Sequence, residues 1–220
     1  PSAPSTSDVL IEGNTLLDPG GNAISLRNDF QDSGKRIERV QIRGNSIYSH
    51  GTGTCIMMRG SRDVEVRDHY CQGTFSGFNL DSTATGFGRD TSNDGVLVDG
   101  LTLVGTVAPS GGSALYLSPY HSNVTYRRVV IDDMAAGSNG DCIGVWPPFR
   151  NVRIEDFTLH DCGGNGIQFF ANAVDPSIDV VGRTPDEGLV LEHGSIPDVD
   201  AGNRRDWNPP SGNLFSSAGA

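Results

Sequence analysis

Aspartate residues recur at one turn of a repeating unit, where a carboxylate could bind a cation or move a proton. Asp18, Asp133, Asp161 and Asp198 occupy equivalent turn positions, and the last three belong to consecutive units. Adjacent units of a stacked sheet lie about 5 Å apart. That spacing suits a Ca²⁺ site, a proton-sharing pair or the two carboxylates of a retaining glycosidase. His160 precedes Asp161 and is a candidate base. Because aspartate is also a common turn residue, a purely structural role stays open.

A second candidate site is the outward side of the third strand in each unit. Its residues combine aromatic rings with amides, a carboxylate and an arginine: Met57, Arg59, Asn79, Asp81, Tyr116, Trp146, Gln168 and Phe170. Sugar rings stack on aromatic side chains, and sugar hydroxyls hydrogen-bond to polar groups. Insertions at 81–93, 118–122 and 171–186 would wall this face into an oligosaccharide-binding groove. Packing of the aromatics under their own loops, or in an oligomer interface, is the alternative.

A repeat that returns seven times positions these residues. An apolar residue is followed by a second two positions later and a third seven positions later. The first positions are Val9, Val40, Val64, Val96, Val124, Val152 and Leu189. In six units a further strand follows, with inward pairs such as Ile56/Met58 and Leu115/Leu117. Alternation with period two predicts strands rather than helices, and such units bury a shared core only when they stack.

The repeat therefore predicts an all-β fold, a right-handed single-stranded parallel β-helix of about seven coils. Residues 8–198 would form the β-helix, 1–7 an N-terminal extension and 199–220 an irregular C-terminal tail. Neither end carries a cap helix of its own, so we expect caps from further sequence, a partner or another copy. Asn14 and Asn45 share a turn position and predict a short asparagine ladder. A Greek-key sandwich, which needs hairpin turns, is the alternative.

Charge limits the classes of partner. The chain has 16 Lys and Arg against 27 Asp and Glu, a formal net charge of -11, which argues against nucleic acid or an anionic membrane as partner. No apolar run approaches the roughly 18–20 residues of a membrane helix. The first strand of each unit presents a column of mixed sign, which predicts a solvated, self-neutralising face: Glu12, Arg43, Arg67, Asp99, Arg127, Glu155 and Glu192.

The four cysteines are expected to be free thiols. Cys55 and Cys142 share an outward position where the third strand begins, but they lie three coils apart, on the order of 14 Å. Cys162 likewise follows Cys71 by three coils. Such distances exceed the reach of a disulfide, and free thiols are compatible with assembly in the cytoplasm.

With this repeat, residues 8–198 resemble the pectin-lyase-like right-handed β-helices, which include pectate lyases, polygalacturonases and bacteriophage tailspikes. Gly140-Asp141-Cys142-Ile143 resembles the D-D segment of polygalacturonases with Gly140 replacing the first aspartate, so Asp141 joins the catalytic candidates. Gly112-Ser113-Ala114 and Gly164-Asn165-Gly166 stand where N-T-D and G-H-G would, and no R-I-K follows. Inverting hydrolysis needs both an acid and a base. Polygalacturonase activity is therefore disfavoured.

These features favour a virion-associated β-helix, of tailspike, tail or surface-decoration type, that recognises a bacterial surface polysaccharide, with cleavage left open. It would trimerise or dock on a larger particle and be found on a virion or outside the cell. The core of a secreted polysaccharide hydrolase or lyase is the first alternative. Arg127 and Arg153 weaken the lyase version, because they lie on the first-strand face, away from Asp133 and Asp161. A purely structural or adhesive module is the second alternative. No cofactor is expected, with Ca²⁺ as the one ion considered.

Overall fold

The architecture is known from a computed structural model of the chain. It describes residues 6–28, 37–81, 92–108, 112–119, 121–134, 140–146, 150–169 and 189–192. Strands and connecting turns account for all of these residues. The described part of the chain contains no helix that could cross a membrane.

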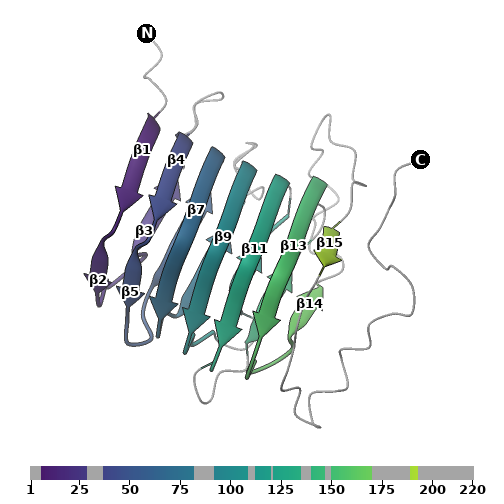
Figure 1. Ribbon diagram of the computed structural model, residues 1–220. Helices are drawn as coiled ribbons and strands as arrows, with labels where there is room; N and C mark the ends of the chain where they lie inside the picture. The colour runs from purple at the N-terminus through teal and green to yellow at the C-terminus, as the bar shows by residue number, and fades with distance from the viewer. Residues whose placement is uncertain are drawn as a thin grey trace, which may run out of the picture.

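The strands form two parallel sheets that enclose one core (Figure 1). The first sheet stacks β1 (Thr6–Glu12), β4 (Ile37–Arg43), β7 (Ser61–Gln72), β9 (Asp94–Val104), β11 (Ser122–Asp132), β13 (Arg150–Leu159) and β15 (Leu189–Glu192), with β2 (Thr15–Leu17) and β5 (Ser46–Tyr48) beside its first strands. The second sheet stacks β3 (Ile24–Arg27), β6 (Thr54–Arg59), β8 (Ser76–Leu80), β10 (Ser113–Leu117), β12 (Asp141–Val145) and β14 (Ile167–Phe169).

This arrangement is a parallel β-solenoid of about five turns, which confirms the predicted fold class with slightly fewer coils than expected. The pairing follows the repeat residue by residue. Val40 pairs with Val9 on one side and with Val64 on the other, and Val152 pairs with Leu189. The same register continues through every strand of the first sheet. The repeat therefore identified both the strands and their alignment.

Residues in the left-handed backbone region make the turns between faces. Gly44, Asp68, Gly100 and Arg128 share one bend of the first sheet, with φ between 48° and 81°. At this bend the chain changes direction, so inward residues are separated by three positions instead of two. Aspartate, asparagine and glycine tolerate this conformation better than other residues do. Most of the left-handed residues in the described part of the chain are accordingly aspartate or glycine.

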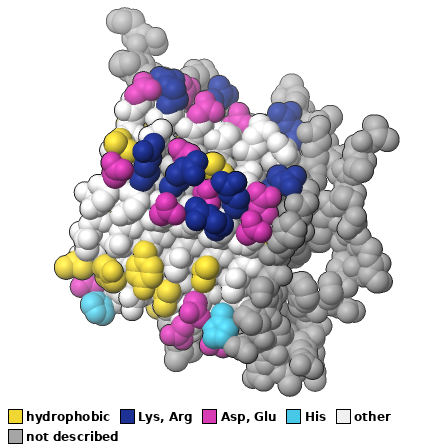
Figure 2. All heavy atoms as spheres, viewed as in Figure 1, with side chains coloured by type: hydrophobic (Ala, Val, Ile, Leu, Met, Phe, Trp, Pro, Cys, Tyr) yellow, Lys and Arg dark blue, Asp and Glu magenta, His cyan; other side chains and the backbone are white. Residues whose placement is uncertain are grey.

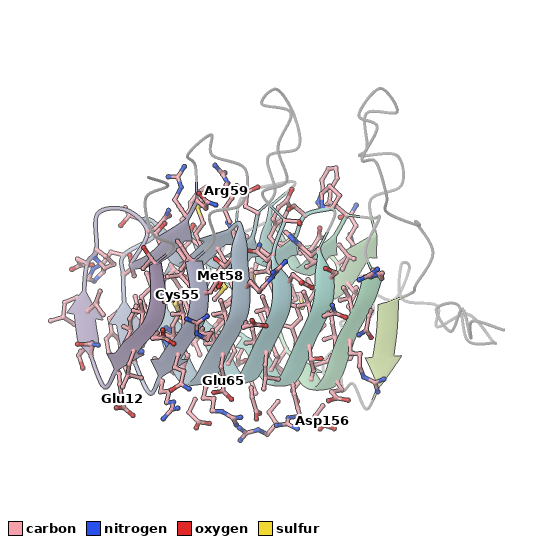
Figure 3. All side chains as sticks on the ribbon, turned by 90° about the horizontal axis from the view of Figure 1, so that it is seen from above. Glu12, Cys55, Met58, Arg59, Glu65 and Asp156 are labelled. Carbon is pink, nitrogen blue, oxygen red and sulfur yellow. A yellow bond between two sulfur atoms is a disulfide. The ribbon has the colours of Figure 1, made fainter. Side chains whose placement is uncertain are left out.

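The core consists of the inward residues of both sheets. Ile42 and Ile47 from the first sheet and Ile56 and Met58 from the second are 0% exposed. Figure 3 shows Met58 between the sheets, whereas the neighbouring Arg59 points outward. Burial of this alternating set is the main stabilising term, because free energy follows the apolar area removed from water.

Tyr126, the largest fully buried side chain, gives a direct test of the core. Its hydroxyl has no hydrogen-bond partner, while its ring packs edge-to-face on Phe78 at a centroid distance of 5.8 Å. An unpaired buried hydroxyl costs about 1–3 kcal/mol. Tyr126→Phe keeps the ring and should raise the free energy of unfolding by about 1 kcal/mol, measured by urea titration. Tyr48→Phe, at an exposed ring, is the matched control, and a loss of stability in Tyr126→Phe would contradict the assignment.

The prediction of four free thiols is wrong. Cys55 is bonded to Cys71 with 6.1 Å between their Cα atoms, and Cys142 is bonded to Cys162 with 5.4 Å. Both distances suit a disulfide. The prediction compared only cysteines at equivalent positions of distant coils, whereas each bond joins non-equivalent positions of consecutive turns. Cys55 and Cys142 are also fully buried instead of pointing outward. Each disulfide therefore ties one turn of the solenoid to the next.

The predicted asparagine ladder is confirmed at the first bend. The backbone N–H and the Nδ2 of Asn14 donate to Oδ1 of Asn45 at 3.0 and 2.9 Å. Nδ2 of Asn45, which is fully buried, donates in turn to the carbonyl of Ile11 at 3.0 Å. The ladder satisfies buried polar groups that the exposed first turn would otherwise leave unpaired.

The column of mixed charge on the first sheet forms an ordered network around one buried carboxylate. Asp99, 2% exposed, accepts hydrogen bonds from Nη1 of Arg67 at 3.2 Å, Nη2 of Arg127 at 2.5 Å and Nε of Arg128 at 2.5 Å. Figure 2 shows this band of basic and acidic side chains across the first sheet. The expected pairing of opposite charges is present among the described side chains of this column, but its central residue, Asp99, is buried and not solvated as predicted.

A polar network that the sequence did not reveal lies where the second sheet leads back to the first. The buried side chain of Asn93 accepts the N–H of Ser61 at 3.0 Å, and its backbone N–H donates to Nδ1 of His121 at 3.0 Å. Nε2 of His121 lies 3.1 Å from the carbonyl of Leu80. His121 therefore has a structural role, because it pairs backbone groups that would otherwise be buried without partners.

Candidate ligand-binding face

The candidate site lies on the outer side of the second sheet. Met57, Asn79, Tyr116 and Gln168 stand in one row across β6, β8, β10 and β14, and Gly144 of β12 occupies the position between the last two. We call these five residues the central row. Strand pairing brings them together although they are up to 111 residues apart in the sequence. Four of the predicted binding residues therefore share one row.

The remaining predicted binding residues stand beside this row. Arg59 ends β6 and Asp81 directly follows β8, and the two residues form an ion pair. Trp146 follows β12, and its backbone N–H donates to the carbonyl of Leu117 at 2.9 Å. Phe170 lies outside the described residues, as do most of the three loops that were expected to wall the groove. The described residues of this set share one side of the second sheet, while binding at this face and its walls stay predictions.

A row of polar residues that was not predicted from the sequence borders the central row on the side opposite Arg59, Asp81 and Trp146. It contains Thr54, Ser76, Ser113, Asp141 and Asn165, each three positions before a residue of the central row. Simple alternation fails here because two consecutive residues, Cys142 and Ile143 in β12, both belong to the core. The recurring polar residue three positions before the central row was the signal that could have revealed it.

Asp141 is the most tightly held polar group of this row. It is 3% exposed, and its Oδ1 accepts the backbone N–H of Asn165 at 2.8 Å and the Nδ2 of the same residue at 3.0 Å. Gln168 lies against its other oxygen, with the amide nitrogen 2.5 Å from Oδ2 when the amide faces the carboxylate. Burial raises the pKa of Asp141, against the opposing effect of the Asn165 hydrogen bonds. A carboxyl group flanked by two amides can both accept and donate hydrogen bonds as it titrates.

Two aromatic rings belong to the same side of the sheet: Tyr116 stands in the central row, and Trp146 lies beyond that row, on the side away from Asp141. The centroids of Tyr116 and Trp146 are 6.3 Å apart, and the planes are tilted by 54°. Gly144 stands between Tyr116 and Gln168 in the central row, and it is buried. Burial raises the pKa of Tyr116, and the nearby charge of Asp81 adds to the effect. The phenol therefore stays protonated and available as a hydrogen-bond donor.

The other catalytic candidates lie at a different edge of the solenoid. Asp133 and Asp161 both have φ of 47°, and Asp18 has 45°, so the predicted equivalence of these turn positions is confirmed. Nδ1 of His160 lies 2.6 Å from Oδ1 of Asp132 and 3.3 Å from Oδ2 of Asp161. The left-handed conformation gives these aspartates a structural reason for being there. Asp198 lies outside the described residues.

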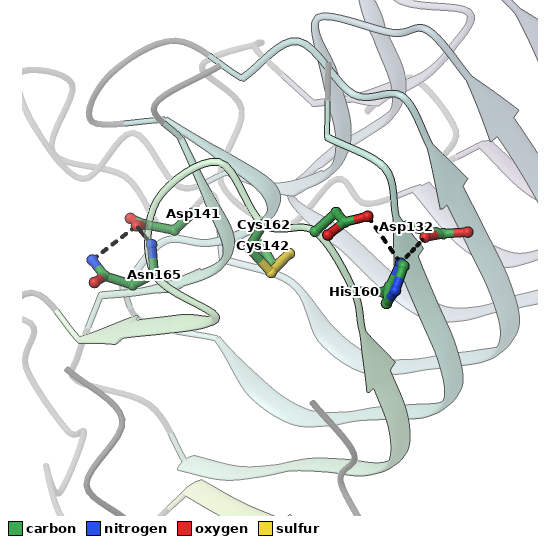
Figure 4. The surroundings of a disulfide bond; sticks show 7 residues. Asp132, Asp141, Cys142, His160, Cys162 and Asn165 are labelled. Carbon is green, nitrogen blue, oxygen red and sulfur yellow. Dashed lines mark hydrogen bonds and ion pairs between the residues drawn. A yellow bond between two sulfur atoms is a disulfide. The ribbon is translucent and has the colours of Figure 1, made fainter. Parts of the chain in front are cut away.

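The structure separates Asp141 from these turn residues. Figure 4 shows Asp141 and Asn165 on one side of the Cys142–Cys162 disulfide, and Asp132 and His160 on the other. The four proposed catalytic residues therefore do not form one site. The turn residues and Asp141 were predicted on separate grounds, and the structure places Asp132 and Asp141 at opposite ends of the connection between β11 and β12.

The turn group has one set of atoms that could hold a metal ion. One ligand atom each from Asp132, His160 and Asp161 lies within 4.8 Å of the others. A ring nitrogen with two carboxylates suits a transition ion better than Ca²⁺, which prefers six to eight oxygens. The contact of His160 with both carboxylates also explains the cluster without an ion.

Searches against protein-family models and curated protein sequences found no match for this chain. The fold and the chemistry of the outer face therefore carry the functional argument.

Proposed function

We propose that this chain is an extracellular or virion-borne β-solenoid that recognises a polysaccharide along the outer face of its second sheet. One observation carries the proposal. The outer side of the second sheet carries both the ring pair Tyr116–Trp146 and, toward the start of its strands, the carboxyl–amide group of Asp141, Asn165 and Gln168. Rings for stacking and fixed hydrogen-bonding groups on one face are what a sugar with one apolar and one hydroxylated side requires.

The repetition of the face supports a chain-like ligand over a single small sugar. The central row crosses five strands, each about 4.8 Å from the next. Polar groups of the row that contains Asp141 recur on the same strands, so successive sugar units would meet similar environments. We accordingly place the chain with the polysaccharide-binding proteins of pectin-lyase-like type, in line with the resemblance of its repeat.

The two disulfides support a location outside the reducing cytoplasm, because structural disulfides persist in oxidising compartments. Free thiols therefore no longer support assembly in the cytoplasm, and the disulfides favour a secreted or surface-exposed protein. Contact with further copies or with a particle is supported by Leu17 and Tyr48, exposed at 72% and 39% on the first sheet. Large apolar side chains in a contiguous exposed area favour protein contacts.

Recognition is favoured over cleavage by the placement of the described carboxylates on this face. Asp81 is ion-paired with Arg59, and two strand spacings separate its strand from that of Asp141. Those spacings alone amount to about 9.6 Å, and the two residues are also offset along their strands. Retaining glycosidases need about 5–5.5 Å and inverting ones about 6.5–9.5 Å between carboxyl groups.

The test is binding of the oxidised full-length chain to a polysaccharide array, followed by titration calorimetry with the best ligand. Trp146→Ala and Tyr116→Ala should each lower the affinity about tenfold to a hundredfold, because each removes an aromatic anchor. Tyr48→Ala, on the other sheet, is the matched control and should bind like wild type. Equal binding by wild type and Trp146→Ala would contradict the proposal. If the wild-type protein released reducing ends from the polysaccharide, the proposed function would have to change from recognition to hydrolysis.

A further inference from the structure

His69 is a buried polar residue, and its position in the fold does not explain why a histidine is found there. It continues the column of Asn14 and Asn45, and the next turn has Leu101 at the same position. The asparagine ladder does not extend to it, because the side chain of Asn45 hydrogen-bonds toward the preceding turn. Leu101 is fully buried, so an apolar side chain fits this column well.

Both ring nitrogens of His69 lack a hydrogen-bond partner, although the residue is only 1% exposed. Burying such a group without a partner costs about 1–3 kcal/mol. In its neutral form the imidazole keeps a free lone pair on one ring nitrogen. A neutral imidazole with an unused lone pair is the form that binds metal ions.

The sulfur atoms of one disulfide lie beside this ring. A ring nitrogen of His69 and the Sγ atoms of Cys55 and Cys71 all lie within 4.8 Å of one another. No carboxylate belongs to this group, and all three residues are fully or almost fully buried. Two thiolates and one imidazole are ligands that Zn²⁺ prefers.

We propose that the dithiol form of this chain binds one Zn²⁺ through Cys55, His69 and Cys71. A dithiol reductant gives two electrons and two protons to the disulfide, which yields two thiols and the oxidised cyclic reductant. Zinc then displaces the two thiol protons, and the neutral imidazole loses none. Two thiolates balance the charge of Zn²⁺, so the buried complex has no net charge, as a low-dielectric core requires. The site therefore exchanges a disulfide crosslink between two turns for a metal crosslink.

The experiment compares the zinc content of wild type and variants of the whole chain. Each protein is unfolded in denaturant together with a phosphine reductant and is then refolded with excess Zn²⁺. It is desalted before the metal is measured. Reduced wild type should retain one zinc per chain and unfold at a higher temperature than without zinc. Leucine already occupies the equivalent position one turn later, at Leu101. The oxidised form of His69→Leu should therefore fold with an intact disulfide. Its reduced form should retain no zinc, a loss beyond the roughly hundredfold weakening caused by removing an outer-shell partner.

The second disulfide provides a matched control, because no histidine or carboxylate accompanies it in a comparable cluster of the described residues. The double variant Cys142→Ser/Cys162→Ser should still retain one zinc when reduced, and Cys55→Ser/Cys71→Ser should retain none. Zinc-free reduced wild type would overturn the proposal. Undiminished zinc in His69→Leu, or its loss from the Cys142→Ser/Cys162→Ser variant, would overturn it equally.

Discussion

The double substitution Cys142→Ser/Cys162→Ser should lower the free energy of unfolding by about 3 kcal/mol. The bond joins residues 20 positions apart and holds consecutive turns together near the C-terminal end of the described solenoid. Without it the unfolded chain gains the freedom of an open loop, while the folded state keeps its core. Guanidinium unfolding of the oxidised protein at constant pH measures the difference.

The same substitution should also weaken the ligand-binding face. Asp141 immediately precedes Cys142, and Asn165 follows Cys162 by three residues, so the disulfide fixes the separation of two groups joined by a 2.8 Å hydrogen bond. Cys55→Ser/Cys71→Ser is the control, since it removes a crosslink of similar loop length in a different part of the stack. It should lose similar stability and keep polysaccharide affinity. Equal stability of wild type and the first variant would contradict a structural role for this bond.

Acidification from about pH 4 to pH 2 should destabilise the protein through Asp99. Hydrogen bonds from Arg127, and then Arg128, lower the pKa of this carboxyl from 3.8 to about 2 against the opposing effect of burial. A pKa lower in the folded state than in the unfolded state means that folding favours the ionised form. The contribution is therefore complete above pH 4 and is lost as the pH falls through 2. It amounts to about 2 kcal/mol.

Asp99→Asn tests this assignment. The amide keeps the shape of the side chain but removes the charge that three arginines share, so the variant should be less stable near neutral pH and less sensitive to acid. Asp68→Asn is the matched control, because Asp68 is an exposed partner of Arg128 at 3.3 Å and exposed pairs contribute little. Equal loss of unfolding free energy between pH 4 and 2 in wild type and Asp99→Asn would show that other carboxylates govern acid sensitivity.

The sequence was sufficient for the solenoid, its register and its faces. Val40, Val64 and Val96 pair as the repeat predicts, and the outward residues Asn79 and Tyr116 fall in one row. This succeeds because alternation records which side of a strand each residue occupies. Stacked parallel strands then convert equal positions in the repeat into neighbours in space.

Contacts between unequal positions could not be predicted in this way. The Cys55–Cys71 bond crosses from one sheet to the other between consecutive turns, and His160, which was paired with Asp161 in the prediction, lies nearer to Asp132. The polar row of Asp141 was hidden because Cys142 and Ile143 both point inward, which breaks the alternation. Each of these contacts depends on how sharply a connection bends.

The sequence by itself determined that the chain stacks in register and that an aromatic–polar face points outward. Only the tertiary structure decided which polar groups meet around the corners, including the disulfides, the Asp141–Asn165 contact and the buried His69. The physical reason is that periodicity describes direction within a strand. The distance across a corner depends on turn conformations, such as the left-handed residues at 133 and 161, which the alternation does not encode.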